Sequence, residues 1–172
     1  MKLENYIANV PNFPKEGIQF KDITTLLQNK DAFKECIDRL CNFGKEVGAN
    51  VVMGPDARGF IFGSAVAYAL NTSFVPVRKP GKLPRDTISC EYALEYGTNT
   101  LEINKDAFKK GDKVLIVDDL MATGGTIVAS INLAEKLGAE VVGVASVIEL
   151  TELKGTEKIG NIPFLSLVKY DI

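Results

Sequence analysis

The chain has 172 residues, of which 46% are hydrophobic and 24% are charged, and its formal net charge is −2. These values predict one globular domain over residues 1–172, and a nearly neutral chain lacks the basic field that favours nucleic-acid binding. Because the sequence contains no histidine, any general acid or base must be another side chain or the substrate, and histidine-dependent catalytic triads are excluded.

Neither a leader segment nor a membrane span is predicted. The N-terminal residues lack the apolar stretch of a signal peptide, and the longest apolar runs, such as Val141–Ile148, are too short to cross a bilayer. Cys36, Cys41 and Cys90 are odd in number and have no metal-ligand spacing, which favours free thiols in a reducing compartment. We therefore expect a cytoplasmic protein without membrane or nucleic-acid partners.

Strands and helices alternate along the chain after an N-terminal arm. Residues 12–24 have the composition of an extended arm with two aromatic anchors, Phe13 and Phe20. Continuous apolar strands between helices predict an α/β fold with a mostly parallel central sheet flanked by helices. In chain order, the periodicity predicts an amphipathic helix over Asp31–Gly48, a strand over Val51–Met53, a helix apolar on most sides over Gly59–Leu70, strands over Phe74–Val77 and Val114–Val117, a helix over Gly124–Leu137 and a strand over Glu140–Glu149.

One long segment, from Lys79 to about Tyr96, fits neither the helical nor the strand period. It begins with Pro80 and Gly81, and we expect a surface excursion that partly forms a hairpin with Thr98–Ile103. Long segments of this kind are either mobile filler or active-site lids.

The most informative segment is Val114–Thr126, with the sequence VLIVDDLMATGGT. Gly124 and Gly125 allow the loop Ala122–Thr126 to fold tightly, so that its amides point outward at a helix N-terminus, where an anion is favoured. The hydroxyls of Thr123 and Thr126 add donors. The glycine spacing matches neither a Walker loop nor the dinucleotide fingerprint, and the segment predicts a site for a single phosphate.

Two acids, Asp118 and Asp119, stand directly before this loop. Paired carboxylates would repel a polyphosphate but can accept hydrogen bonds from the neighbouring hydroxyls of a ribose. The combination predicts recognition of a ribose 5-phosphate. The alternative is an ordinary strand-to-helix turn in which both acids are solvated caps.

Two further segments suit a second, more highly charged anion. Asp56-Ala57-Arg58 follows a strand and starts a helix, where the guanidinium and helix amides could grip pyrophosphate. The basic run that contains Arg78, Lys79 and Lys82 follows the carboxyl end of another strand, where open α/β sheets place ligands. The alternatives are an Asp–Arg surface pair and a solvated basic face.

These segments together resemble the type I phosphoribosyltransferases. VLIVDDLMATGGT resembles the family's binding signature for 5-phosphoribosyl-1-pyrophosphate, and Asp56-Ala57-Arg58 resembles its pyrophosphate loop, which in relatives contains a non-proline cis peptide. Residues 13–24 resemble the FPxxGIxFxDIT arm of the adenine-specific members, and Ala93–Gly97 resembles their SLEYG lid. In the lid, Cys90–Ala93 departs from the more usual serine-rich run.

The resemblance implies a fold, a reaction and an assembly. It implies the type I phosphoribosyltransferase fold, with an N-terminal base-binding arm within residues 1–30 and a mobile lid loop. The implied reaction belongs to purine salvage: adenine and 5-phosphoribosyl-1-pyrophosphate give AMP and pyrophosphate, with Mg²⁺ held mainly through the substrate. A homodimer is also implied.

The resemblance assigns roles to individual residues. Phe20 would stack on the purine while the backbone of Gln19 and Lys21 bonds its edge, and a core position for Phe20 is the alternative. Acceptors other than adenine (guanine, hypoxanthine or xanthine) and a DNA-binding regulator that senses the same substrate remain alternative functions. Glu95 and Asp118 would be catalytic, with Glu95 managing a proton on the base. Glu95 and Tyr96 would belong to the lid, for which an exposed hairpin is the alternative. Phosphoribosyl binding is assigned to Asp118, Asp119, Ala122, Thr123, Gly124, Gly125 and Thr126, and pyrophosphate binding to Asp56, Ala57, Arg58, Arg78, Lys79 and Lys82.

Overall fold

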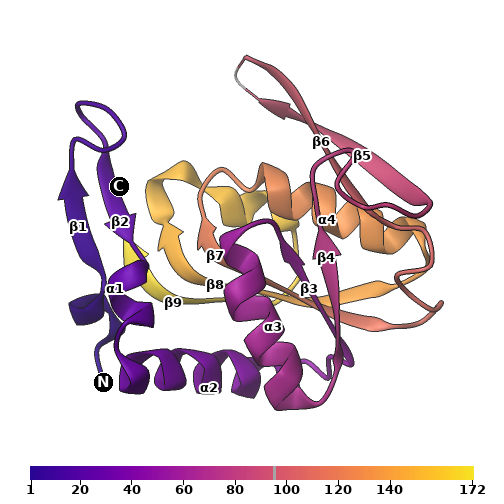
Figure 1. Ribbon diagram of the computed structural model, residues 1–172, viewed down its shortest axis with the longest axis horizontal. Helices are drawn as coiled ribbons and strands as arrows, with labels where there is room; N and C mark the ends of the chain where they lie inside the picture. The colour runs from indigo at the N-terminus through magenta and orange to yellow at the C-terminus, as the bar shows by residue number, and fades with distance from the viewer. Residues whose placement is uncertain (95) are drawn as a thin grey trace.

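A five-stranded, entirely parallel sheet forms the centre of the computed structural model, which describes residues 1–94 and 96–172 (Figure 1). All carboxyl ends of these strands therefore lie at one edge, and the loops that leave them share that edge. In spatial order the strands are β4 (Ser73–Val77), β3 (Val51–Pro55), β7 (Lys113–Met121), β8 (Glu140–Leu150) and β9 (Phe164–Tyr170).

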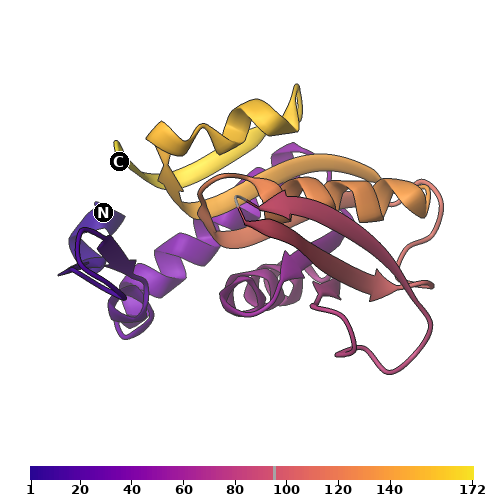
Figure 2. The same ribbon diagram turned by 90° about the horizontal axis from the view of Figure 1, so that it is seen from above.

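Helices cover both faces of the sheet, as Figure 2 shows from above. On one face α2 (Lys30–Glu46) and α3 (Arg58–Leu70) pack with buried side chains such as Leu40 and Phe62. On the other face α4 (Gly125–Lys136) packs with Ile131 and Leu133. The predicted α/β fold with a parallel sheet between helices is confirmed.

Two antiparallel hairpins stand outside the central sheet (Figure 1). The N-terminal hairpin pairs β1 (Ala8–Pro11) with β2 (Gln19–Asp22), and the second pairs β5 (Thr87–Leu94) with β6 (Gly97–Asn104). In Figure 1 they project on the same side of the sheet, one from each end of the molecule. The short elements are η1 (Leu3–Tyr6), α1 (Thr24–Leu27), η2 (Thr151–Leu153) and η3 (Gly155–Ile159).

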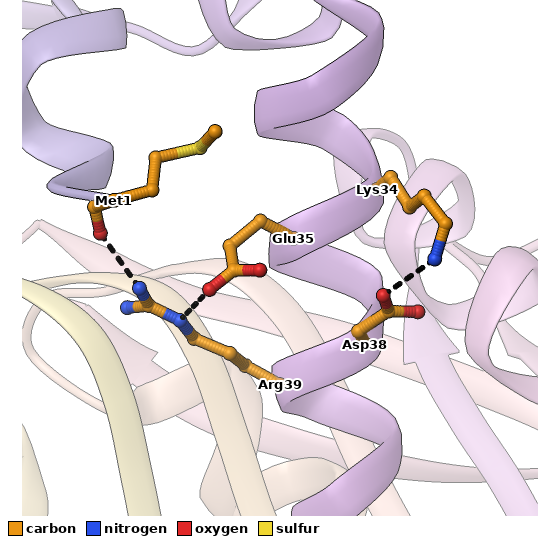
Figure 3. A network of polar contacts seen from close by, with 5 residues as sticks. All are labelled: Met1, Lys34, Glu35, Asp38 and Arg39. Carbon is orange, nitrogen blue, oxygen red and sulfur yellow. Dashed lines mark hydrogen bonds and ion pairs between the residues drawn. The ribbon is translucent and has the colours of Figure 1, made fainter.

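The N-terminus is tied to α2 by polar contacts. Arg39 donates from its guanidinium to the Met1 carbonyl oxygen at 2.7 Å and pairs with Glu35 at 3.0 Å, one turn earlier (Figure 3). Asn29 caps the helix, because its side-chain oxygen accepts from the amides of residues 31 and 32. These contacts fix the segment that leads into the N-terminal hairpin.

The strand expected at Val114–Val117 is longer than predicted. It continues through Asp118 and Asp119 to Met121, and Asp118 lies opposite Ser146 of β8. Two adjacent acids do not match the apolar pattern of a buried strand, so the strand predicted from that pattern ended too early. The acids consequently stand inside the ladder and not in a loose turn.

The segment from Lys79 to Tyr96 is more regular than expected. Residues 79–86 are irregular, whereas Thr87–Leu94 pairs with β6 along its whole length. Within the strand Ile88, Cys90 and Tyr92 are partly buried and alternate with exposed residues. The expected hairpin is therefore present, and the second half of the predicted excursion belongs to it.

The helix expected over Gly59–Leu70 is not enclosed on most sides. Phe62 and Val66 lie on its buried stripe, whereas Ile61 is 39% exposed and Tyr68 is 90% exposed. Only one side of α3 rests on the sheet, so the apolar residues on its other side face outward in the single chain. None of the helices within the described residues combines the length and apolarity needed to cross a bilayer.

Candidate functional site

A cavity of about 690 Å³ opens at the carboxyl edge of the sheet. The loops after β3 and β7, the end of β5 and η3 surround it. Its position agrees with the rule that open α/β sheets bind ligands at this edge. The cavity is lined by Pro55, Asp56, Ala57, Arg58, Tyr92, Ala93, Leu94, Asp118, Asp119, Leu120, Met121, Ala122, Thr123, Gly124, Gly125, Thr126, Ile127 and Lys158.

The loop between β7 and α4 forms the floor of this cavity. Gly124 has a φ of 88° as the residue that precedes α4, and a Cβ there would lie 2.9 Å from the Gly155 carbonyl oxygen. A Cβ on Gly155 would in turn meet the Ala122 carbonyl oxygen. The segments that contain Gly124 and Gly155 can thus approach each other closely, because neither residue has a Cβ. This arrangement presents the first amides of α4, a twelve-residue helix, to the cavity. The loop has the geometry predicted for a phosphate loop, and phosphate binding itself stays a prediction.

Asp118 and Asp119 lie above that loop and are not solvated caps. Asp119 is only 9% exposed, and its amide donates to Asp118 Oδ1 at 2.7 Å. A Cβ on Gly59 would lie 3.0 Å from Asp118 Oδ1, so α3 starts in close contact with this carboxyl group. Burial, reinforced by the neighbouring Asp119 charge, raises the pKa of Asp118 well above its usual 3.8. Both acids line the cavity.

Asp56, Ala57 and Arg58 line the opposite wall, and the Asp56–Ala57 peptide is cis. Asp56 does not pair with Arg58; its Oδ2 lies 2.9 Å from Arg78 Nε. Arg58 instead pairs with Asp119, with 2.6 Å between Nε and Oδ2. The alternative of an Asp–Arg surface pair within this segment is therefore wrong.

The basic cluster is not gathered at the cavity. Arg78 lies behind Asp56, held by backbone hydrogen bonds to Glu102 on β6. Lys79 and Lys82 are exposed on the following loop and do not line the cavity. Their assignment to pyrophosphate remains a prediction, whereas Arg78 has a visible role in fixing Asp56.

The N-terminal hairpin approaches the cavity through Arg58. Phe20 is partly exposed and packs edge-on against Phe13 with 5.2 Å between ring centroids, so it is not a core residue. The Arg58 guanidinium carbon lies 5.9 Å from the centroid of Phe20. The side chains of Gln19 and Lys21 hydrogen-bond to Asn9, and none of the three predicted base-binding residues lines the cavity itself.

The predicted lid corresponds to the tip of the β5–β6 hairpin. Tyr96 is 90% exposed there. Glu95 lies outside the described residues, so its assignment as a catalytic residue stays a prediction. Leu94, the last residue of β5, already lines the cavity.

Eight residues of the cavity wall were not assigned to the site from the sequence, and two of them, Tyr92 and Lys158, carry polar groups. Tyr92 reaches the wall from β5, and its alternation with Ile88 and Cys90 was a usable signal for a strand facing α4. Lys158 reaches it from η3, which the sequence pattern did not predict. Lys158 adds a positive charge beside the phosphate loop.

Known protein sequences match this chain over most or all of its length. A family model described as "Phosphoribosyl transferase domain" matches residues 20–163. An adenine phosphoribosyltransferase of Clostridium novyi (strain NT) is 59% identical over 172 residues, which is 100% of both chains. An enzyme of the same name from Clostridium kluyveri is 55% identical over the same length.

Solved structures of adenine phosphoribosyltransferases match the fold of this chain. The crystal structure of adenine phosphoribosyltransferase from Thermoanaerobacter pseudethanolicus superposes with a TM-score of 0.94 at 49% identity and covers 98% of each chain. The enzyme of Trypanosoma brucei, solved in complex with AMP, pyrophosphate and ribose-5-phosphate, has a TM-score of 0.88 at 31% identity and covers 98% of this chain and 78% of that one.

Proposed function

This chain belongs to the phosphoribosyltransferase family and has its type I fold, and we propose that it transfers the phosphoribosyl group of 5-phosphoribosyl-1-pyrophosphate to adenine. The products are AMP and pyrophosphate. The observation that carries the proposal is the acid pair at the end of β7, with Asp119 buried, directly before a glycine loop at the start of α4, in a chain that matches adenine phosphoribosyltransferases over its full length.

The phosphate loop and the acids would hold the donor's ribose phosphate. Amides of the loop Ala122–Gly125 and the Thr123 and Thr126 hydroxyls would donate to the 5-phosphate, which the partial positive charge of the helix end also favours. The carboxyl groups of Asp118 and Asp119 would accept hydrogen bonds from the two ribose hydroxyls. This binding fixes the anomeric carbon between the two walls of the cavity.

Pyrophosphate would take the wall formed by Asp56, Ala57 and Arg58. For Arg58 to bind pyrophosphate, its guanidinium must leave Asp119, which frees that carboxylate for the ribose. The exchange is favourable because pyrophosphate offers several charged oxygens where Asp119 offers one carboxylate. Arg78, Lys79 and Lys82 complete the proposed pyrophosphate set.

We propose Mg²⁺ as the cofactor. Oxygen ligands suit this ion, and Asp118 and Asp119 provide carboxylates at the site, but the described residues contain no cluster of three or more potential ligands. Oxygens of the substrate would therefore supply most of its coordination. When bound, the ion would neutralise charge on the leaving pyrophosphate.

The base would lie against Phe20, with its edge on the backbone of Gln19 and Lys21. In the transfer, the bond between the anomeric carbon and the pyrophosphate oxygen breaks as the bond to a ring nitrogen of adenine forms, and the nitrogen releases a proton. Glu95 would accept that proton, since the sequence has no histidine to do so. Closure of the hairpin tip, including Tyr96, would exclude water from the cationic transition state.

We also propose a cytoplasmic homodimer. The apolar side chains of Ile61 and Tyr68 on the outer side of α3 support an interface, because one chain leaves them uncovered. Sedimentation of the active enzyme at twice the monomer mass is the expected result. An active monomer would contradict this part of the proposal.

One assay tests the reaction. The purified chain is mixed with 5-phosphoribosyl-1-pyrophosphate, Mg²⁺ and one purine base at a time, and pyrophosphate release is followed. We expect release with adenine and far slower release with guanine, hypoxanthine or xanthine. Release with a different base would change the acceptor, and no release with any base would refute the proposed activity.

A further inference from the structure

Tyr92 lies where the β5–β6 hairpin meets the start of α4. A Cβ placed on Gly125 would lie 2.9 Å from Tyr92 Cδ2, so the ring packs directly over the Gly125 backbone. The Thr126 hydroxyl donates to the Tyr92 hydroxyl at 3.4 Å, and the side-chain amide of Asn99 donates to it at 3.5 Å. Tyr92 therefore contacts two consecutive residues of the phosphate loop and helix start.

This contact is one end of a longer contact between β5 and α4. The Lys136 ammonium donates to the Ser89 carbonyl oxygen at 2.9 Å, and the Asn132 side chain donates to Cys90 Sγ at 3.9 Å. The strand thus lies along α4 from its last turn to its first, which the two ribbon views also show (Figures 1 and 2). Tyr92 is held at the helix start by this whole length of contact and not by the hairpin tip.

We propose that Tyr92 is a positioning residue for the 5-phosphate, an inference that rests on the proposed function. Its ring covers Gly125 on one side, so the loop amides keep their direction toward the cavity. Its hydroxyl holds Thr126 Oγ1 at the cavity wall. When phosphate binds, the Tyr92 hydroxyl donates to Thr126 Oγ1, so that the single Thr126 hydroxyl proton is free for the phosphate. A threonine hydroxyl in a helix can otherwise turn to a backbone carbonyl of the preceding turn. An arriving phosphate then meets donors that are already oriented.

A positioning role and a purely structural role predict different results. If Tyr92 only stabilised the fold, its loss would weaken every ligand alike. If it orients the phosphate donors, its loss must weaken ligands in proportion to their phosphate contacts. AMP and adenosine separate the two cases, because they differ only in the phosphate.

The experiment measures the dissociation constants of AMP and adenosine by calorimetry for the wild-type chain, Tyr92→Phe, Tyr92→Leu and the control Tyr6→Phe, whose hydroxyl lies outside the cavity. We expect Tyr92→Phe to weaken AMP by about 2–10-fold, the usual effect of one neutral hydrogen bond, with adenosine unchanged. Tyr92→Leu, which also removes the ring, should weaken AMP further. KM for 5-phosphoribosyl-1-pyrophosphate should rise in parallel while kcat is retained, because the lost interaction is made equally in ground and transition states.

Thermal unfolding of each variant accompanies the titrations. An equal loss of affinity for both ligands, or no loss for AMP in Tyr92→Phe and Tyr92→Leu, would overturn the proposal. A wild-type chain that binds AMP no better than adenosine would refute the proposed phosphate site itself. That outcome is visible in the first titration, before any variant is measured.

Discussion

Arg58 and Asp119 form an ion pair across the cavity, with 2.6 Å between Nε and Oδ2. The pair joins a residue proposed for pyrophosphate to a residue proposed for the ribose. Its Arg58 side chain is 52% exposed, so water screens the attraction and the pair contributes little to stability. Such a contact can be exchanged for a multiply charged substrate, and we infer that donor binding separates the two side chains.

Arg58→Gln tests this exchange. Loss of the guanidinium should raise KM for 5-phosphoribosyl-1-pyrophosphate by about 10–100-fold, the usual effect of removing hydrogen bonds to a charged group. Product inhibition by pyrophosphate should weaken by a similar factor. The matched control is Arg85→Gln, which removes an exposed pair with Asp106 outside the cavity and should leave both constants unchanged. Unaltered inhibition by pyrophosphate in Arg58→Gln would remove Arg58 from the pyrophosphate site.

Asp118→Asn should stabilise the fold at neutral pH while it lowers activity. Burial and the Asp119 charge raise the pKa of Asp118 above 3.8, so in the window above 3.8 the folded chain retains a proton that the unfolded chain has released. Stability contributed by this group therefore falls as pH rises through that window. Asparagine keeps an acceptor oxygen for the Asp119 amide but cannot ionise.

Thermal unfolding of this variant at pH 4 to 8 provides the measurement. We expect Tm to exceed the wild-type value at pH 8 by about 2–4 °C for each kcal/mol that ionisation costs, with the difference shrinking toward pH 4. Asp86→Asn changes an exposed carboxyl group and should shift Tm little at any pH. If the wild-type Tm instead rose relative to that of Asp118→Asn with increasing pH, the direction of the Asp118 pKa shift would be wrong.

Gly124→Ala should damage the phosphate loop more than the same change damages an ordinary turn. Both Gly124 and Gly48 have positive φ, 88° and 73°, so alanine is strained at either site by about 1–2 kcal/mol. Only at Gly124 would the new Cβ also meet backbone, the Gly155 carbonyl oxygen at 2.9 Å, whereas nothing lies within 4 Å at Gly48. We expect both variants to carry similar strain from the positive φ, but only Gly124→Ala, which also displaces the loop, to lose AMP binding, as measured by calorimetry beside thermal unfolding. Equal AMP affinity in the two variants would show that the loop tolerates displacement.

The sequence was most informative where short-range pattern and site chemistry coincide. The string from Val114 to Thr126 predicted a strand, an acid pair and a phosphate loop, because each depends on neighbouring residues. The predicted strand ended early at Val117, because the pairing of Asp118 with Ser146 involves β8, a partner distant in sequence.

Contacts between distant segments could not be predicted in the same way. The approach of Gly155 to Gly124, and the position of Lys158 at the cavity, depend on how η3 returns to the sheet. Likewise, the basic run forms one cluster in the sequence. In the structure Arg78 pairs with Asp56 and Arg85 pairs with Asp106, while Lys79 is exposed. Charge patterns in loops do not specify which partner each side chain meets.

Glu95→Gln addresses the proposed proton acceptor. Glutamine has the size of glutamate but cannot take a proton from adenine, so turnover should fall by about 10²–10⁴-fold, the contribution typical of general acid–base catalysis. Substrate affinity should change far less, because the carboxylate acts on a proton that moves only as the new bond forms. The matched control is Glu91→Gln on the exposed side of β5, which does not line the cavity and should retain full turnover. Steady-state kcat and KM for both substrates give the answer: unchanged kcat in Glu95→Gln would remove this residue from the reaction, and a rise in KM at constant kcat would reassign it to binding.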